Sequence, residues 1–292
     1  MLTLDLGIVQ RRAHFPTMKA AVGWSVGWII LAMLFALFIW FQRGTTGALE
    51  FVTGYVVELA LSVDNVFVFI VIFTYFAVPK ESHHTVLFWG VLSAIVFRAI
   101  FIVLGAALVA KFHWILYLLG AFLVFTAIKL AVQGETEVRP EKNPFLNAAR
   151  KLFPVTARYE RNKFFIRSGG KLSITPLLLV LLMIETTDIA FATDSIPAIF
   201  AITRDTFIIY TSNIFAVLGL RSLYFVVAGF MKQFRYLKYG LSVVLAFIGV
   251  KMLIDIWAEI PIIYSLLIIF GIIVISIIAS LLPHQQRQEK RL

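Results

Sequence analysis

The sequence predicts an all-α fold, a polytopic transmembrane helical bundle that forms a single membrane domain over residues 1–292. Hydrophobic residues make up 61% of the chain and charged residues only 14%, whereas a soluble domain usually has about 25% charged residues. The chain also contains about eight apolar stretches of roughly 20 residues, the length that a helix needs to cross a bilayer. Finally, Lys and Arg gather in alternate connecting segments, as they do in membrane proteins.

The predicted spans are joined by short connections, apart from one long loop at 133–175. In chain order, the spans cover 22–41, 50–74, 86–110, 112–132, 176–201, 207–231, 236–256 and 262–282. The apolar run of the first span is long, and no clear small-x-small cleavage site follows it. We therefore expect an uncleaved helix there and not a signal peptide.

The basic residues predict the orientation of the chain. If the amino terminus is cytoplasmic, 19 of the 26 Lys and Arg residues lie in cytoplasmic segments, three lie in outside segments and four lie within spans. The positive-inside rule then places both termini in the cytoplasm. The same distribution accounts for the net charge of +10, so no nucleic-acid partner is needed to explain it.

Two short structures are expected within the long loop. Phe145, Leu146, Ala149, Leu152 and Phe153 recur at helical spacing, which predicts a short amphipathic helix on the cytoplasmic surface. The stretch FFIRSGGKLSI, with its Ser-Gly-Gly turn, predicts a small β-hairpin. A solvated linker is the alternative for both segments.

Matched features in the same order predict an internal repeat. The segment ELALSVDN, residues 58–65, aligns with DIAFATDS, residues 188–195, so that each has an acid, five residues, an aspartate and then Asn or Ser. The next span of each copy contains an arginine, and the one after it contains a tyrosine followed 12 residues later by a lysine. These residues are Arg98, Tyr117 and Lys129 in the first copy and Arg221, Tyr239 and Lys251 in the second.

The two copies should be inverted with respect to each other. Repeat A covers 50–132 and repeat B covers 176–256, and each holds three spans, while the spans 22–41 and 262–282 flank them. An odd number of spans reverses the direction of the second copy, so a pseudo-two-fold axis should lie in the membrane plane. Many secondary transporters have this plan and bind their substrate near the midplane, between the two halves.

Acidic residues within the spans predict a cation site. A charged side chain at the bilayer centre costs about 3 kcal/mol, so these acids should face the protein interior. With a neighbouring amide and hydroxyl they offer only oxygen ligands, which suit Mn²⁺, Mg²⁺ and Ca²⁺ better than zinc or copper. The candidate metal ligands are Glu58, Asp64, Asn65, Glu185, Asp188, Asp194 and Ser195.

Helix geometry limits how these ligands could meet on one ion. Asp64 and Asp194 lie about 120° around a continuous helix from Glu58 and Asp188. Converging all the carboxylates on one ion therefore requires ligands from both copies or a bend, and Pro197 could supply a bend.

Basic residues within the spans are candidates for charge pairing. We expect Arg98 and Arg221 each to pair with a carboxylate, and Glu185 could be the partner of Arg221. Structural salt bridges to these arginines are the alternative role for the buried acids. Lys129 and Lys251 should lie near opposite membrane surfaces, where snorkelling to the interface is their expected role.

Some polar residues have simpler explanations than ligand binding. Asn65 and Ser195 could instead form hydrogen bonds between helices. His83 and His84 are expected to be solvated residues of a cytoplasmic loop.

Four segments of the chain resemble the TerC family of integral membrane proteins, and the resemblance covers about residues 5–280. The segments are GYVVELALSVDNVFVF, ETTDIAFATDSIPAIFAIT, TSNIFAVLGLRSLYF and KYGLSVVLAFIGVKML. The resemblance implies manganese export across the bacterial inner (plasma) membrane, an association with tellurium-ion resistance and a role in metallating secreted proteins. Similar proteins usually carry a further N-terminal span that ends in an Asp-Leu pair, and here Asp5 stands where that span would end.

We therefore expect a secondary transporter that exports Mn²⁺, with protonation of a carboxylate accompanying release or return. Mg²⁺ and Ca²⁺ remain alternative cargoes, because all three ions accept oxygen ligands. One alternative function is a membrane partner that supplies Mn²⁺ to secreted proteins, with the loop helix docking on the secretion machinery. Another is an indirect role in tellurium resistance, since an acid-rich site repels an oxyanion.

Enzymatic activity is not expected of this chain. It contains neither an HExxH zinc motif nor a GxSxG nucleophile motif. It contains no cysteine, which excludes disulfides and thiolate metal sites.

Overall fold

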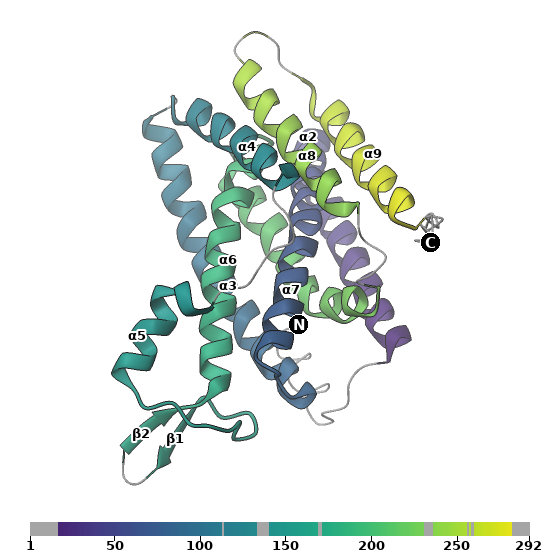
Figure 1. Ribbon diagram of the computed structural model, residues 1–292. Helices are drawn as coiled ribbons and strands as arrows, with labels where there is room; N and C mark the ends of the chain where they lie inside the picture. The colour runs from purple at the N-terminus through teal and green to yellow at the C-terminus, as the bar shows by residue number, and fades with distance from the viewer. Residues whose placement is uncertain are drawn as a thin grey trace, which may run out of the picture.

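The computed structural model describes residues 17–112, 114–132, 140–168, 171–230, 236–255, 257 and 260–281. They form a bundle of long helices with a small β-hairpin at one end (Figure 1). Seven of the described helices are long and apolar enough to cross a membrane, which confirms the predicted all-α transmembrane bundle. The elements are α2 (Met18–Tyr75), α3 (Lys80–Lys111), α4 (Ile115–Val132), η2 (Pro140–Lys142), α5 (Pro144–Leu152), β1 (Phe165–Ser168), β2 (Lys171–Ile174), α6 (Pro176–Phe200), α7 (Thr206–Phe230), α8 (Leu237–Ile254) and α9 (Ile262–Leu281).

Gly44 folds α2 back on itself, so that this helix has two antiparallel arms. The φ and ψ of Gly44 are 77° and −172°, a backbone conformation that is open essentially to glycine alone. The ring centroids of Phe35 and Phe51 lie 5.3 Å apart, whereas 16 residues of straight helix would separate them by about 24 Å. The two arms correspond to the predicted spans 22–41 and 50–74, so the eight predicted spans are found within seven helices.

Helix α3 begins earlier than the sequence predicts. The expected span 86–110 is preceded by further helical residues from Lys80 onward. His83 and His84 therefore lie on a helix, half-buried, and the prediction that they are solvated loop residues is wrong. The Tyr224 hydroxyl lies 3.0 Å from the His83 Nδ1 atom. The polar run KESHHT reads as a loop in the sequence because it gives no sign that α7 packs against it.

Helix α5 and the β1–β2 hairpin project from one end of the bundle, which we call the hairpin end (Figure 1). The Asn143 side-chain oxygen caps α5 by accepting a hydrogen bond of 3.0 Å from the backbone N–H of Phe145. The strands pair antiparallel, with Phe165 opposite Ile174. The helix and the hairpin predicted within 133–175 are thus confirmed. The Gly-Gly turn itself lies outside the described residues.

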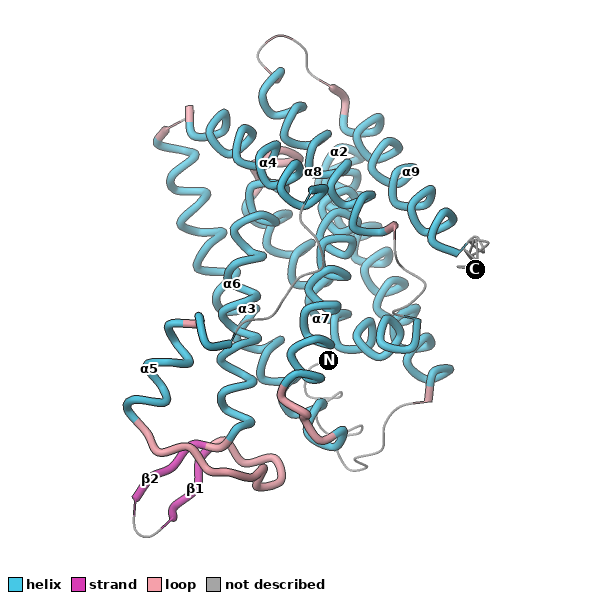
Figure 2. Tube along the Cα trace, in the orientation of Figure 1, coloured by secondary structure: helices cyan, strands magenta, loops and turns pink. Residues whose placement is uncertain are grey.

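Helices α4 and α8 pack backbone to backbone in the half of the bundle farthest from the hairpin end (Figure 2). A methyl group added at Gly249 would lie 2.8 Å from the carbonyl oxygen of Gly120, so only glycine permits this close approach. The Ser242 hydroxyl donates a hydrogen bond of 2.7 Å to the carbonyl oxygen of Ala127. Small residues thus bring the third span of each predicted repeat into direct contact.

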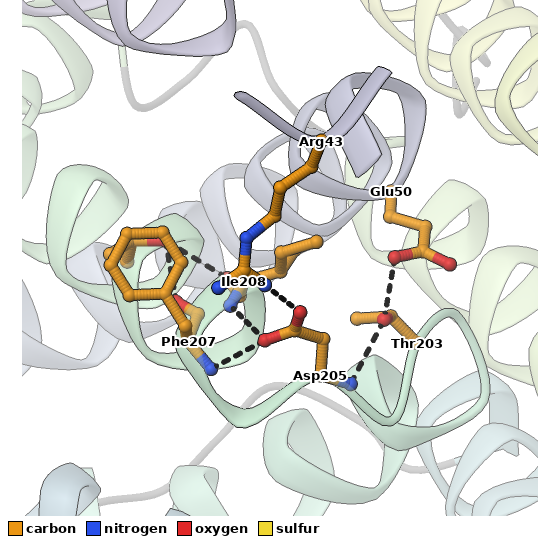
Figure 3. Close-up of polar contacts among 7 residues, drawn as sticks. Arg43, Glu50, Thr203, Asp205, Phe207 and Ile208 are labelled. Carbon is orange, nitrogen blue, oxygen red and sulfur yellow. Dashed lines mark hydrogen bonds and ion pairs between the residues drawn. The ribbon is translucent and has the colours of Figure 1, made fainter. Parts of the chain in front are cut away.

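Polar contacts join α2 to the α6–α7 connection at the opposite end of the bundle, which we call the Gly44 end (Figure 3). Arg43 forms an ion pair with Asp205, and its guanidinium carbon lies 4.8 Å from the centre of the Phe207 ring. The Thr203 hydroxyl donates a hydrogen bond of 2.7 Å to Glu50. These contacts bind the Gly44 turn to the start of α7.

Replacing Gly249 by Ala should lower the thermal stability of the purified protein. The added methyl group would contact backbone atoms of α4 that cannot move alone, and overpacking of this kind costs about 1–3 kcal/mol. Gly271→Ala in α9 is the matched control, because nothing lies within 4 Å of its added methyl group. Thermal unfolding in detergent should show a lower midpoint for Gly249→Ala alone. Equal midpoints for the two variants would contradict the close contact.

Candidate cation site

Arg98 joins four helices at the centre of the bundle. This α3 residue forms an ion pair with Glu58 of α2. Its Nη2 atom lies 3.2 Å from Oδ1 of Asp188 on α6, and its Nε lies 3.4 Å from Oδ2 of the same carboxylate. Its Nη1 atom also donates a hydrogen bond of 3.2 Å to the side-chain oxygen of Asn213 on α7. We call these four residues the Arg98 cluster.

The Arg98 cluster is almost completely closed to solvent. Arg98 and Glu58 are each 1% exposed and Asp188 is 5% exposed. The fork of the guanidinium holds Asp188 in a two-pronged arrangement, the geometry in which arginine binds carboxylates best. Two acids and one base leave a formal charge of −1, so one carboxylate is neutralised by Arg98 and the second adds a negative charge to the interior.

Asp64 and Asp194 line a separate cavity of about 390 Å³ between α2, α4, α6 and α8. We call it the acidic cavity. The Thr126 hydroxyl of α4 donates a hydrogen bond of 3.1 Å to the Asp194 carboxylate. Each aspartate thus comes from the first span of one predicted repeat, and the two face the same space.

Oxygen atoms without hydrogen-bond donors lie beside these aspartates. Asn65 and Ser195 also line the acidic cavity and are 2% and 3% exposed. Within the described part of the chain, the Asn65 Oδ1 and Ser195 Oγ atoms are buried and make no hydrogen bond. A buried polar oxygen that lacks a partner is costly, unless a ligand such as a metal ion satisfies it.

Basic residues moderate the negative charge of the acidic cavity. Lys129 of α4 lines it and is close enough to Asp194 to interact with its charge. Lys238, at the start of α8, similarly acts on Asp64. The lining residues Asp64, Asp194 and Lys129 together carry a formal charge of −1, which favours entry of a cation.

Glu185 and Arg221 have partners of their own. The Ser93 hydroxyl of α3 donates to Glu185, while the second carboxylate oxygen of Glu185 is buried and makes no hydrogen bond to other described residues. Arg221 contacts the His84 imidazole nitrogen, a partner that the sequence did not indicate.

The structure does not bring the seven candidate ligands together in one group. Asp64, Asn65, Asp194 and Ser195 share the acidic cavity, whereas Glu58 and Asp188 belong to the Arg98 cluster. Among the described residues, no three His, Asp or Glu side chains are close enough to hold a metal ion by themselves. Pro197, which could supply a bend, lies inside α6, and this helix continues past it to Phe200.

Three polar residues of these sites were not singled out by the sequence analysis: Ser93, Thr126 and Asn213. Ser93 and Thr126 are lone polar residues within apolar spans, and Asn213 ends a short polar run, Thr211 to Asn213. This is a usable signal but a weak one, because such residues often bond only to their own helix. Their partners come from other helices, so their role becomes visible only once the helices are packed.

The donor set of the acidic cavity fits a hard divalent cation. Two carboxylates, an amide oxygen and a hydroxyl oxygen are the ligand types that Mn²⁺, Mg²⁺ and Ca²⁺ accept. The cavity volume of about 390 Å³ exceeds that of a bare ion, and the remaining space can hold water molecules that complete the coordination shell.

Comparison with known proteins identifies similar sequences over almost the whole chain. The sequence profile described as "Integral membrane protein TerC family" matches residues 43–289. An uncharacterized membrane protein of Myxococcus xanthus is 48% identical over 282 residues, which cover 97% of this chain and 88% of that protein. Proteins of Salmonella typhi and Escherichia coli, each named "Putative membrane-bound redox modulator Alx", are 47% and 46% identical. They align over 99% and 100% of this chain and over 93% and 94% of their own lengths. No solved structure matches the chain.

Replacing Arg98 by Met should destabilise the protein by about 3–5 kcal/mol, because it leaves buried carboxylates without their counter-charge. Arg43→Met is the matched control, since it breaks an ion pair whose side chains are 41% and 35% exposed; such pairs are worth about 0–1 kcal/mol. Thermal or denaturant unfolding in detergent measures both losses.

Neutralising the acids as well should restore much of the stability of Arg98→Met. The variant that combines it with Glu58→Gln and Asp188→Asn no longer buries an unpaired charge. Equal losses for Arg98→Met and Arg43→Met, or no recovery in the combined variant, would show that Arg98 does not act as the internal counter-charge.

Proposed function

Because the chain belongs to the TerC family of integral membrane proteins, we propose that it is a secondary transporter that exports Mn²⁺ from the bacterial cytoplasm. Mn²⁺ is the cargo in this proposal, and the acidic cavity is its binding site. Asp64 and Asp194 supply the charged ligands, while Asn65 and Ser195 supply neutral oxygens.

A single observation carries this proposal. Two carboxylates from corresponding places in the sequence line one cavity within a transmembrane bundle, next to two buried oxygens that lack donors. Ionisable residues at such depth usually mark an ion or proton pathway. A purely structural role would require partners for these oxygens, and the described residues supply none.

The basic residues support an orientation of the chain in which export would run towards the Gly44 end. The hairpin end contains the Lys- and Arg-rich segment between α4 and α6, so the positive-inside rule places this end in the cytoplasm. The Gly44 end then faces the opposite side of the inner membrane. Export would move the ion from the acidic cavity towards the Gly44 end.

Pairs of contacts between α4 and α8 support the inverted-repeat proposal. The alignment that places Lys129 over Lys251 also places Gly120 over Ser242 and Ala127 over Gly249. Gly120 faces the backbone of Gly249, and Ser242 bonds to the backbone of Ala127. An axis relating the two copies would exchange these two contacts, and rocking of the copies about such an axis would give alternating access.

Glu185 is our candidate for the residue that exchanges a proton during transport. Its carboxylate accepts a hydrogen bond from Ser93 through one oxygen, whereas the other oxygen has no donor among the described residues. A protonated carboxyl group tolerates such a position better than a charged one. In this proposal the Arg98 cluster positions α2, which carries Asp64, and α6, which carries Glu185 and Asp194.

The exposed side of α5 favours a second candidate function, the supply of Mn²⁺ to secreted proteins through a docked partner. Phe145 and Leu152 are 60% and 74% exposed, next to the basic residues Arg150 and Lys151.

The redox role named for the similar proteins would need chemistry other than thiol exchange here, since the chain has no cysteine. Tellurium resistance would be indirect, because the acidic cavity repels an oxyanion.

Asp64→Asn and Asp194→Asn should each reduce Mn²⁺ efflux from loaded vesicles at least about tenfold, because each removes a charged ligand while keeping the side-chain shape. Glu81→Gln is the control, since Glu81 is an exposed acid in the first turn of α3. Efflux is measured as loss of entrapped Mn²⁺ over time, with Mg²⁺ and Ca²⁺ tested in parallel. Equal efflux from wild type and both aspartate variants would end the proposal.

The pair Phe145→Ser and Leu152→Ser separates the two candidate functions. If α5 docks a partner, this variant should supply less Mn²⁺ to a secreted Mn²⁺-dependent enzyme in cells, because it removes the exposed apolar contacts. Its vesicle efflux should equal that of wild type, because neither residue lines the acidic cavity. Normal enzyme metallation in cells that produce the variant would count against docking through α5.

A further inference from the structure

A second cavity lies at the Gly44 end, on α2, α4, α8 and the last residue of α6, which are the helices that also line the acidic cavity. It has a volume of about 290 Å³ and is lined by residues of α2, α4 and α8 and by the α6–α7 connection. We call it the Gly44-side cavity. Glu50, which lines it, precedes Asp64 on α2 by 14 residues, or about 21 Å of helix. The two cavities therefore lie at successive depths along one set of helices.

A layer of apolar side chains separates the two cavities. Val57 of α2, Ile196 of α6 and Ile248 of α8 each lie between the residues of their helix that line the two cavities. They are 1%, 6% and 1% exposed and belong to one hydrophobic cluster. A layer of this kind excludes water, and a hydrated cation cannot pass it without a conformational change. The structure thus has an acidic cavity that is closed off from the Gly44 end.

Lys251 is the unusual residue of the Gly44-side cavity. It is only 8% exposed and lines the cavity, and no hydrogen bond or ion pair joins its ammonium group to another described residue. Glu50 and Asp255, which line the same cavity, are near enough to interact with its charge. Burying most of a charged side chain is costly, so the position of Lys251 at the wall of this cavity calls for a functional reason.

The two cavities differ in net charge. The Gly44-side cavity is lined by Glu50 and Asp255 against Arg204 and Lys251, which gives a formal charge of zero. The lining residues of the acidic cavity carry −1, from two aspartates against Lys129, and Lys238 acts on Asp64 from outside the lining. Both cavities are thus lined by two carboxylates. The lining of the Gly44-side cavity has one more basic residue, which makes this cavity the weaker cation site.

We propose that the Gly44-side cavity is the exit site of the transported divalent cation, and that Lys251 is a resident positive charge that expels the cation from Glu50 and Asp255. This inference rests on the proposed export of Mn²⁺ and adds the place and the means of release. Carboxylates at the exit attract the ion across the apolar layer, and the ammonium group then lowers the affinity so that the ion leaves. Efficient conduction needs this combination of attraction and weak retention.

The predicted repeat gives Lys251 a counterpart. Lys129 is aligned with Lys251, and each lysine lines one of the two cavities. Two inverted copies that exchange conformations would bring each lysine in turn next to the binding carboxylates. Lys129 would then facilitate dissociation towards the hairpin end and Lys251 towards the Gly44 end.

Lys251→Met tests the proposal through inhibition by external Mn²⁺. The measurement uses right-side-out membrane vesicles, in which the Gly44 end faces the bath, loaded with radioactive Mn²⁺. Without the ammonium charge the exit site should retain Mn²⁺, and the external concentration that halves efflux should fall about tenfold, as expected for a change of about one charge–charge contact. Lys111→Met is the control, because Lys111 is exposed at the same end of the bundle and lines neither cavity.

A binding measurement separates failure of this inference from failure of the proposed function. In the detergent-purified full chain carrying Asp64→Asn and Asp194→Asn, adding Lys251→Met should create a Mn²⁺ site that electron paramagnetic resonance detects as loss of free-ion signal. Adding Glu50→Gln should abolish that site.

Each outcome of the two experiments has one interpretation. Wild-type efflux with unchanged inhibition in Lys251→Met would overturn the exit-site proposal alone. Absence of a new site in the binding measurement would also overturn it, provided that the variant elutes as wild type in size-exclusion chromatography. Wild-type vesicles without Mn²⁺ efflux would overturn the proposed function, and the exit site would fall with it.

Discussion

The whole arrangement depends on one buried arginine. A bilayer cannot solvate Glu58 or Asp188, so the acids that α2 and α6 carry must find their counter-charge inside the protein. Arg98 supplies it from α3 and binds Asn213 of α7 as well. This contact sets the relative positions of the four helices. It therefore also sets the distance between Asp64 and Asp194, which lie about 1.7 turns further along α2 and α6.

The spacing of the acidic motif explains why the acids form two sites and not one. Glu58 and Asp64 are six residues apart, as are Asp188 and Asp194, and six residues turn an α-helix by about 600°, which leaves the two side chains about 120° apart. One acid of each pair can thus face Arg98 while the other faces the acidic cavity. The same six-residue interval on α2 and α6 directs one acid of each helix to the Arg98 cluster and the other to the acidic cavity.

The bundle could be predicted from the sequence far more completely than the site. Apolar length determines the spans because each must cross about 30 Å of hydrocarbon, and the boundaries found for α6 to α9 differ little from those expected. The need of Arg98 for acidic partners also follows from its depth in the bilayer. The choice of acids that Arg98 contacts depends on how α2, α3, α6 and α7 pack, and so does the contact of Arg221 with His84. Hydropathy holds no information about that packing. The reversal at Gly44 was expected as a loop, because a glycine joint between two nearly continuous helices has the same composition as a short polar connection.

The single-residue joint at Gly44 has a consequence for biosynthesis. A translocon that releases helices into the lipid one at a time needs a polar connection long enough to wait at the surface while the next helix is made. The two arms of α2 have almost none, because helix resumes immediately after Gly44, and Arg43 is already paired with Asp205 in the folded protein. We therefore expect the arms to enter the membrane together as a helical hairpin, with the packing of Phe35 against Phe51 among the first tertiary contacts that the nascent chain makes.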